Sequence, residues 1–259
     1  MALHARVRRA LRTGGGFQVP PDWEAGAPDF VGVGVQKAGT SWWYALLAEH
    51  PEVDVRAVAH KELHFFDDAA ALDLAEELPS AYAQEFRRPR GKRCGEWTPR
   101  YCFDPWSLDA LHGAAPGAAV LLALRDPVAR CRSGVEHAIR RGTVLSAALI
   151  TEHIQRSDYL PQVARAQDLF GDAVLVLQLE RMAEDTRGEY RRTLQHLGLS
   201  PFDPPSRDQP RNVGSGDRWQ LPVPVARAIQ RRAVADADEL AARCPALDLT
   251  RWPSLGRSK

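Results

Sequence analysis

The sequence predicts a single α/β domain whose central parallel sheet is flanked by helices on both faces. The chain has 259 residues, of which 44% are hydrophobic, so one substantial core can form. Three short apolar runs have the character of fully buried strands, and helical stretches separate them. Strands that alternate with helices in this way favour a parallel sheet that binds ligands at the carboxyl ends of its strands.

The first strand and helix are expected within residues 30–47. Residues 30–35 form an apolar, β-branched run, residues 36–40 form a polar turn, and residues 41–47 form a helix that stops before Pro51. Two further strands are expected at residues 119–124 and 173–177. Helices are expected near residues 71–87, 105–113, 127–141, 146–170 with a break around Ser157, 181–197 and 222–243.

Composition shifts divide the chain into a leader and a domain. Residues 1–28 form a basic leader rich in glycine and proline, and residues 29–259 form the domain. Residues 200–220 form a long loop with several prolines and glycines, as functional lids often do. No apolar run of signal-peptide or membrane-span length follows the basic residues near the N-terminus. We therefore expect a cytoplasmic protein that does not enter a membrane.

The charge balance and the cysteines exclude several classes of partner. The 34 Lys and Arg residues nearly match the 33 Asp and Glu residues, which argues against nucleic acid or an anionic membrane as a partner bound by bulk charge. The four cysteines show neither a metal-ligand spacing nor a disulfide framework. An anion site must therefore be local, and no metal site is expected.

The turn at residues 34–41 has the composition of a phosphate-binding loop. It joins a strand to a helix, where backbone N–H groups and the helix dipole favour an anion. The loop of ATP- and GTP-binding proteins reads GxxxxGK[ST], whereas here Thr40 follows Gly39 and the lysine is Lys37. We expect a sheet of the P-loop type that serves neither a kinase nor a GTPase.

A second anion site is expected at the end of the strand at residues 119–124. Arg125 follows this strand, Asp126 can cap the next helix, and Ser133 lies two helical turns further on. A guanidinium and a hydroxyl that converge suit a phosphate monoester. Taken singly, an Arg paired with Asp126 and a solvent-facing Ser would also account for these residues.

Titratable side chains gather at residues 60–68, which read HKELHFFDD. An apolar wall can raise the pKa of a carboxyl group toward the working pH, so the segment suits acid-base chemistry. On composition alone, an exposed charged loop anchored by Phe65 and Phe66 fits equally well.

Together these segments resemble the sulfotransferases that use 3'-phosphoadenosine 5'-phosphosulfate. Their 5'-phosphosulfate loop reads PKSGTTW or RKGGT, and their 3'-phosphate motif reads LRDPxxRxxSxY. The resemblance implies that Lys37 contacts the 5'-phosphosulfate and its bridging oxygen, and that Arg125 and Ser133 bind the 3'-phosphate. It also implies that the remaining donor-binding residues of the loop cradle the 5'-phosphate and approach the adenine: Ala38, Gly39, Thr40, Ser41 and Trp42.

The acid-base segment resembles KExHFFD of the heparan sulfate 3-O-sulfotransferases and their bacterial relatives. The resemblance implies that Glu62 deprotonates the acceptor, while Lys61, His64 and Asp67 orient the base or the sulfuryl group. His64 stays open as an alternative base. A further segment resembles GExTPxY with Trp97 in place of lysine, which suggests a flatter and less charged acceptor than a polyanionic glycan. The resemblance is clearest over residues 29–220.

The sequence thus predicts an enzyme that transfers a sulfuryl group to a hydroxyl, or as second choice an amine, of a small-molecule or glycan acceptor. No metal is required, because Lys37, Arg125 and backbone amides meet the charge of the donor. A small-molecule kinase of the P-loop type and a non-catalytic nucleotide-binding module are the alternatives, and the oligomeric state stays open. The lid contributes four candidate donor-binding residues: Arg211, Asn212, Val213 and Gly214.

Overall fold

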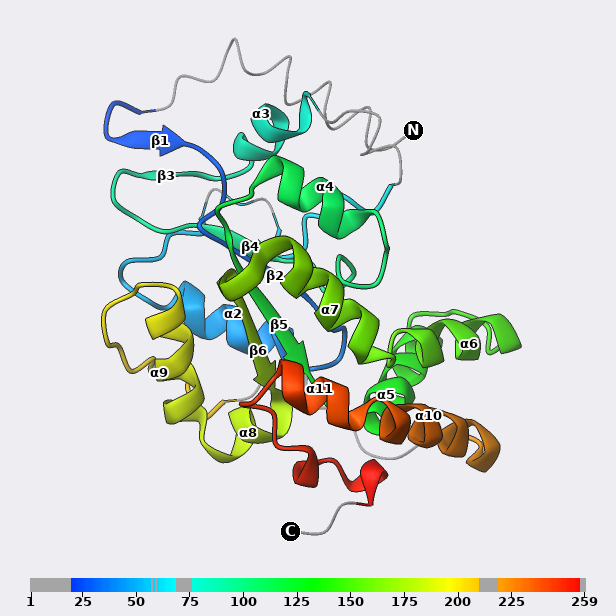
Figure 1. Ribbon diagram of the computed structural model, residues 1–259. Helices are drawn as coiled ribbons and strands as arrows, with labels where there is room; N and C mark the ends of the chain where they lie inside the picture. The colour runs from blue at the N-terminus through cyan, green and yellow to red at the C-terminus, as the bar shows by residue number, and fades with distance from the viewer. Residues whose placement is uncertain (1–19, 57, 59, 69–75, 210–218, 257–259) are drawn as a thin grey trace.

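A four-stranded parallel sheet forms the centre of the computed structural model (Figure 1). The structure describes residues 20–56, 58, 60–68, 76–209 and 219–256. The strand order is β4-β2-β5-β6. The strands are β2 (Phe30–Gly34), β4 (Gly95–Trp97), β5 (Ala119–Leu124) and β6 (Val174–Gln178). The predicted parallel sheet is confirmed, and β2, β5 and β6 lie where the apolar runs predict them.

Strand β4 is the member of the sheet that the sequence analysis did not predict. It has only three residues and its central residue is Glu96, so it gives no apolar run. Its pairing with β2 depends on glycine, because a Cβ atom on Gly95 would lie 2.1 Å from the carbonyl oxygen of Phe30. A Cβ atom on Gly32 would lie 2.0 Å from the ring of Trp97. Gly95 therefore lets the two strands pair closely, and Gly32 leaves room for the ring of Trp97.

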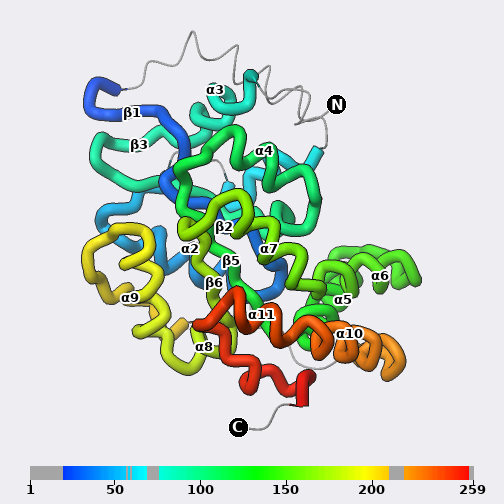
Figure 2. The backbone as a smooth tube through the Cα atoms, viewed as in Figure 1, coloured from blue at the N-terminus to red at the C-terminus, as the bar shows by residue number. Residues whose placement is uncertain are grey.

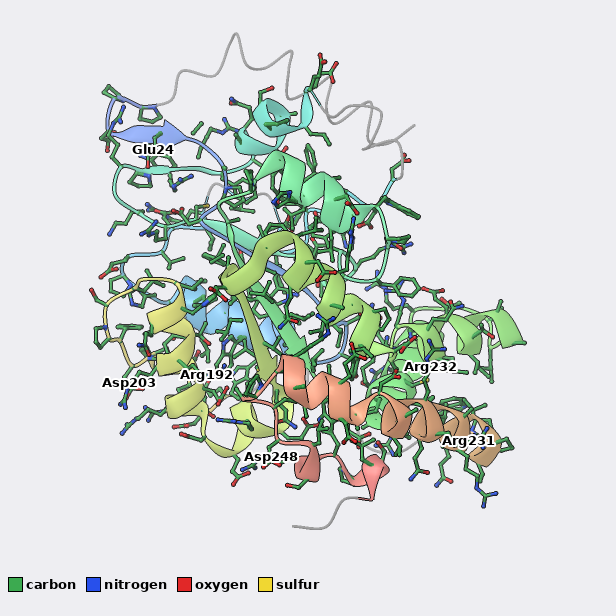
Figure 3. All side chains as sticks on the ribbon, in the orientation of Figure 1. Glu24, Arg192, Asp203, Arg231, Arg232 and Asp248 are labelled. Carbon is green, nitrogen blue, oxygen red and sulfur yellow. The ribbon has the colours of Figure 1, made fainter. Side chains whose placement is uncertain are left out.

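Helices cover both faces of the sheet, as predicted (Figure 1). On one face, α2 (Thr40–Ala48) packs against α9 (Thr186–His196), and Trp43 Nε1 donates a 3.0 Å hydrogen bond to Thr193 Oγ1. Arg192 of α9, labelled in Figure 3, donates to the carbonyl of Val176 in β6 at 3.0 Å. On the other face lie α4 (Ser107–Ala114) and α7 (Tyr159–Phe170), with α11 (Ala237–Arg243) against α7.

Three predicted helices differ from those observed. The stretch 181–197 is not one helix, because Asp185 leaves the helical conformation and its carboxylate caps α9 by accepting the Gly188 N–H at 2.9 Å. It therefore divides into α8 (Leu179–Glu184) and α9. The stretch 222–243 divides at Asp236 into α10 (Val223–Ala235) and α11. Of the stretch 71–87, only α3 (Leu78–Ala83) is helical in the described part, and residues 71–75 lie outside it.

A two-stranded antiparallel sheet lies beside the main sheet. Strand β1 (Trp23–Ala25) pairs with β3 (Arg87–Pro89), so part of the predicted leader contacts the segment before β4. Among the described residues, none of the helices combines the length and the apolar character needed to cross a bilayer.

Helix α5 (Pro127–Arg140) projects from the body together with α6 (Ala147–Gln155) and α10 (Figure 2). Four buried side chains form a small second core between these helices: Cys131, Val135, Leu149 and Ile229. The predicted helix at 127–141 and the predicted break around Ser157 are confirmed. The projection begins at the carboxyl end of β5, so its base borders the candidate site.

Candidate active site

The loop between β2 and α2 has the backbone conformation of an anion cradle. Gly39 precedes α2 with φ of 79°, and a Cβ atom there would lie 2.7 Å from Leu179 Cδ1, so only glycine fits. Lys37 also has a positive φ, of 74°. The first N–H groups of α2, at Thr40 and Ser41, have no helical carbonyl to bind. They lie at the carboxyl end of β2, where a helix N-terminus favours an anion.

Two predicted cations meet at this loop. The Nη1 atom of Arg125 donates to the carbonyl of Lys37 at 3.2 Å. Burial lowers the pKa of Lys37, and the positive charges of Arg140, Arg125 and Arg130 lower it further. A bound anion would relieve this repulsion between cations. The loop therefore fits a ligand that carries several negative charges, as the predicted donor does.

The remaining loop residues are placed as follows. Ala38 is fully buried, Ser41 is half-buried, and Trp42 is 4% exposed. Trp43 packs in the core, and its ring centroid lies 5.4 Å from that of Trp42 in an edge-to-face pair. The buried Nε1 atom of Trp42 has no hydrogen-bond partner within the described residues. This indole N–H is thus free to meet an acceptor atom of a bound ligand.

The second predicted site lies where β5 leads into α5. Asp126 caps α5 by accepting the Ala129 N–H at 2.9 Å, as predicted. Tyr159 donates to the carbonyl of Arg125 at 2.7 Å, which fixes the main chain there. Arg125 and Ser133 are both half-buried. Within the described residues no hydrogen bond joins the two side chains, so their joint role stays a prediction.

Arg130, a member of the same motif, joins these segments from inside. It is fully buried, and burial lowers its pKa to about 10. Its Nε donates to the carbonyl of Gln36 at 3.1 Å, and its Nη1 donates to the carbonyl of His153 at 2.7 Å and to Ser157 Oγ at 3.1 Å. Arg130 therefore ties the phosphate loop to α5, α6 and the start of α7.

The acid-base segment lies against the phosphate loop. The Nζ atom of Lys61 donates to Glu62 Oε1 at 2.7 Å and to Thr40 Oγ1 at 3.3 Å. The candidate base and the first residue of α2 therefore share one ammonium group. Sequence spacing could not predict this contact, because 21 residues separate Thr40 from Lys61.

Glu62 and His64 form an ion pair that fixes the charge of both. His64 Nε2 lies 3.3 Å from Glu62 Oε2, and His64 Nδ1 lies 2.8 Å from Asp67 Oδ2. The hydrogen bonds with Asp67 and Glu62 raise the pKa of His64 to about 9. Burial raises the pKa of Glu62, but hydrogen bonds with His64 and the charge of Lys61 outweigh it and lower the pKa to about 2. At neutral pH Glu62 is ionised and His64 is protonated.

This geometry agrees with the comparison of the chain with known families. A model of the sulfotransferase family matches residues 28–204. The chain belongs to the sulfotransferase family. It is therefore a transferase, and the predicted family and enzyme class are confirmed.

Relatives of this sulfotransferase support the family and the fold. The membrane-associated sulfotransferase kil1 of Dictyostelium discoideum is 30% identical over 116 residues, which are 44% of this chain and only 23% of that protein. The crystal structure of a sulfotransferase from Alicyclobacillus acidocaldarius aligns with a TM-score of 0.67 at 24% identity, over 87% of this chain and 98% of that one. Sulfotransferase STF9 from Mycobacterium avium aligns with a TM-score of 0.58 at 13% identity, over 92% and 81% of the two chains.

Helix α5 also carries a histidine that the sequence analysis did not single out. His137 follows Ser133 by one helical turn on α5. Burial and the positive charges of Lys37 and Arg140 lower its pKa, whereas the charge of Glu62 opposes them. His137 is thus within electrostatic reach of both the loop lysine and the candidate base. A histidine one turn after Ser133 was the available signal.

Trp97 does not support the acceptor prediction drawn from it. Its side chain is fully buried beside β2, and its Nε1 donates to the carbonyl of Gly34 at 3.3 Å. An indole packed in this way cannot contact an acceptor. The inference from Trp97 to a flat acceptor was therefore wrong, because the residue fills the core between β4 and β2.

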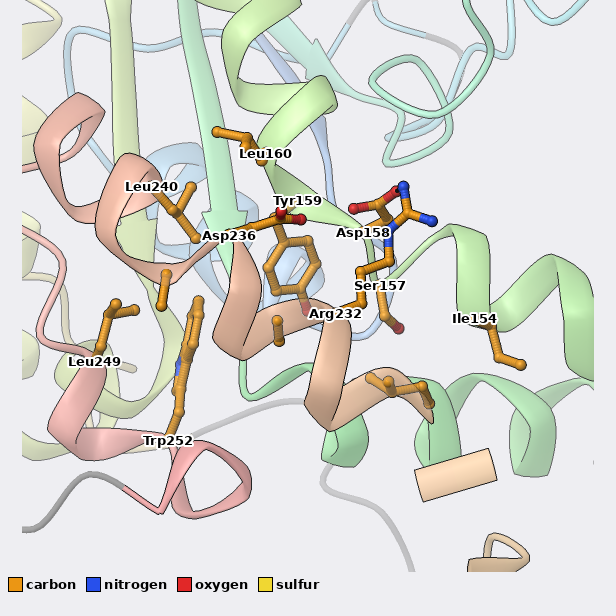
Figure 4. A pocket seen from close by; sticks show the side chains of 13 residues that line it. Ile154, Ser157, Asp158, Tyr159, Leu160, Arg232, Asp236, Leu240, Leu249 and Trp252 are labelled. Carbon is orange, nitrogen blue, oxygen red and sulfur yellow. Dashed lines mark ion pairs between the residues drawn. The ribbon is translucent and has the colours of Figure 1, made fainter. Parts of the chain in front are cut away.

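The cavity drawn in Figure 4 lies apart from this chemistry. It is bounded by α7, α10 and the C-terminal segment, and its volume of about 20 Å³ holds roughly one water molecule. Tyr159 and Trp252 face each other in it with ring centroids 5.7 Å apart. One of its lining residues, Tyr159, is the side chain that holds the carbonyl of Arg125.

The four lid candidates, Arg211, Asn212, Val213 and Gly214, lie outside the described residues. In the part of the chain that the structure describes, no group of three or more His, Cys, Asp or Glu side chains is arranged to hold a metal ion.

Proposed function

We propose that this sulfotransferase transfers the sulfuryl group of 3'-phosphoadenosine 5'-phosphosulfate to a hydroxyl of a small-molecule or glycan acceptor. The observation that carries the proposal is the ammonium group of Lys61, which bridges Glu62 and Thr40. Through it, an ionised carboxylate lies beside a loop built for an anion. An acceptor hydroxyl and an anionic donor can therefore meet at one place.

The phosphate loop provides the electrostatic part of the reaction. The donor supplies an activated sulfuryl group, and its leaving oxygen gains negative charge as the bond to sulfur breaks. Lys37 is crowded by other cations and half-buried, so its ammonium is suited to stabilise that developing charge. The first-turn amides of α2 and the guanidinium of Arg125 are suited to hold the phosphate groups.

Glu62 is better suited than His64 to accept the proton of the acceptor. A general base must have a free lone pair, and His64 has none while it is protonated. Glu62 is ionised at neutral pH and 39% exposed at its side chain, so an acceptor can reach it. Its pKa of about 2 makes it a weak base in the free enzyme. As the acceptor oxygen bonds to sulfur and the bond to the leaving oxygen breaks, the hydroxyl proton becomes strongly acidic, so a weak but well-positioned carboxylate can accept it.

Isothermal titration calorimetry with nucleotides tests the donor. We expect adenosine 3',5'-bisphosphate to bind more tightly than ADP or AMP, and ATP with Mg²⁺ to bind no better than ADP. Arg125→Ala should weaken adenosine 3',5'-bisphosphate by about 1.5 to 3 kcal/mol, the scale of a charge-assisted hydrogen bond. The control Arg187→Ala removes a cation that pairs with Asp203 at the surface and should bind as the wild type does.

Two results would refute this assignment. Equal affinity for the three nucleotides would remove the evidence for a 3'-phosphate site. Tight, Mg²⁺-dependent binding of ATP would favour the kinase alternative instead.

A further inference from the structure

A buried carboxylate lies directly behind the acid-base segment. Glu96, the central residue of β4, has no exposed surface. Its Oε2 atom accepts from the Leu63 N–H at 3.0 Å and from Thr98 Oγ1 at 2.5 Å. Its Oε1 atom accepts from the phenols of Tyr82 at 2.7 Å and Tyr101 at 2.9 Å. Four donors thus meet the four lone-pair directions of one carboxylate.

Two of these donors also bind the main chain of the acid-base segment. The N–H of His64 donates to Thr98 Oγ1 at 3.3 Å, and the N–H of Phe65 donates to the phenol oxygen of Tyr101 at 2.8 Å. Together with the direct bond from Leu63, three consecutive amides depend on Glu96. This network holds His64 at φ of 51°, a left-handed conformation that a histidine rarely adopts without such support.

The directions of these hydrogen bonds fix the charge of Glu96. Because Thr98 Oγ1 and the phenol oxygen of Tyr101 each accept an amide N–H, their own protons point to Glu96. A protonated carboxyl would therefore place its proton against a donor. Burial raises the pKa of Glu96 above its usual range, although the four hydrogen bonds oppose that effect. The network matches the ionised form, in which every carboxylate site accepts.

The charge of Glu96 also acts on Lys61. Burial lowers the pKa of Lys61, whereas the negative charges of Glu62 and Glu96 raise it. The carbonyl of Lys61 accepts the Trp97 N–H at 2.8 Å, so the residue is tied to β4 as well. The ammonium that joins Glu62 to Thr40 is therefore supported from β4.

We propose that Glu96 is a positioning residue for sulfuryl transfer, which acts through Thr98 and Tyr101 to hold residues 63–65 and so fixes the positions of Glu62 and His64. The proposal rests on the proposed function for its kinetic consequence, but its structural content stands on the hydrogen bonds alone. Glu96 touches no reacting atom, and nothing in the family match or the resemblance assigns it this role.

A matched pair of tyrosines separates positioning from stability. Tyr82 and Tyr101 are both fully buried and both donate to Glu96 Oε1, but only Tyr101 also binds the amide of Phe65. We expect Tyr101→Phe to lower kcat roughly 10- to 100-fold and Tyr82→Phe to change it less than about 3-fold, at comparable losses of thermal stability. The affinity for adenosine 3',5'-bisphosphate should be unchanged in both variants, because neither touches the phosphate loop.

Two substitutions of Thr98 form a second matched pair, in which the conservative change should preserve activity. Thr98→Val removes the hydroxyl that links His64 to Glu96 and should lower kcat as Tyr101→Phe does, whereas Thr98→Ser keeps the hydroxyl and should retain turnover. These variants avoid Glu96→Gln, in which a buried amide could prevent folding. Equal loss of kcat in Tyr82→Phe and Tyr101→Phe, or a poor Thr98→Ser, would overturn the proposal.

An NMR measurement that does not depend on catalytic turnover keeps this test separate from the proposed function. The imidazole resonances of His64, assigned by their loss in His64→Gln, should shift in Tyr101→Phe and Thr98→Val but not in Tyr82→Phe. Unchanged resonances in all three variants would overturn the positioning role even if sulfuryl transfer is confirmed. Shifted resonances in a protein that uses no sulfuryl donor would support the positioning role and refute only the proposed function.

Discussion

Replacing the buried Arg130 by methionine should destabilise the fold and weaken donor binding together. Methionine fills much of the volume of the arginine stem but cannot donate hydrogen bonds. The change removes the bonds to the carbonyl of Gln36, to Ser157 Oγ and to Nδ1 of His153, which lies 3.1 Å from Arg130 Nη2. The carbonyl of His153 keeps one donor, because Ser157 Oγ also binds it at 3.0 Å.

The size of the effect follows from this count. The carbonyl of Gln36 and Nδ1 of His153 lose their donors, whereas Ser157 Oγ keeps its hydrogen bond to the carbonyl of His153, and each unsatisfied group costs about 1 to 3 kcal/mol. Removing a cation whose burial lowers its pKa to about 10 offsets part of the loss. We therefore expect the free energy of unfolding to fall by about 2 to 4 kcal/mol, a large share of the ~5 to 15 kcal/mol typical of a domain.

Chemical denaturation and calorimetric titration together measure this effect. In Arg130→Met the denaturation midpoint should fall, and the Kd for adenosine 3',5'-bisphosphate should rise because the carbonyl of Gln36 no longer anchors the loop. The control Arg141→Met removes an exposed arginine at the end of the same helix and should change neither quantity. A variant Arg130→Met with a wild-type midpoint and wild-type Kd would show that the buried guanidinium does not hold the loop.

Three further outcomes are expected. Lys37→Ala should lower kcat about 100-fold or more while changing donor Kd little, since the leaving oxygen gains its charge only in the transition state; Lys37→Arg with wild-type turnover would contradict this role. Glu62→Gln should keep its affinity for the donor, and its rate of sulfuryl transfer should fall about 100- to 10,000-fold. If Glu62→Gln stays active while His64→Ala loses its activity, His64 is the base. The ion pairs of His64 with Asp67 and Glu62 raise its pKa and should therefore stabilise the fold. This stability should be complete below about pH 6.5 and should be lost as the pH rises through about 9. The melting temperature of the wild type should decline over that range, whereas that of His64→Gln should not.

Much of the fold follows from the hydrophobic pattern, because β2, β5 and β6 read as continuous apolar runs, with β2 and β5 almost entirely buried and β6 partly buried. The hydrophobic pattern does not predict β4, because Glu96 occupies the buried central position of this strand. A carboxylate in a strand predicts a solvent-exposed position unless the hydrogen-bond donors that stabilise it in the core are known. The donors of Glu96 come from residues up to 33 positions away in the sequence. The break at Asp185 was missed for a similar reason, since its capping of α9 depends on local conformation within an otherwise helical stretch.

Short motifs identified the residues of the candidate site, but they did not predict which of these residues contact one another. Motifs identify Lys37, Glu62 and Arg125 as candidates, since each stands next to a strand end or within a charged cluster. The contact of Lys61 with Thr40 depends on how β4 places the segment before it, and no spacing encodes that. His137 was missed because its spacing of one helical turn from Ser133, the only signal in the sequence, does not reveal that the charges of Lys37 and Glu62 act on it.

The measurement that tests the central claim most directly is transfer of labelled sulfur. The protein is incubated with 3'-phosphoadenosine 5'-phosphosulfate labelled in the sulfuryl group, together with a panel of hydroxyl and amine acceptors, and both products are quantified by mass spectrometry. We expect an acceptor to gain one sulfuryl group for each adenosine 3',5'-bisphosphate released, with transfer abolished in Glu62→Gln. Release of adenosine 3',5'-bisphosphate with label appearing only as free sulfate across the panel, at the same rate in Glu62→Gln, would contradict the assignment of this site to acceptor sulfation.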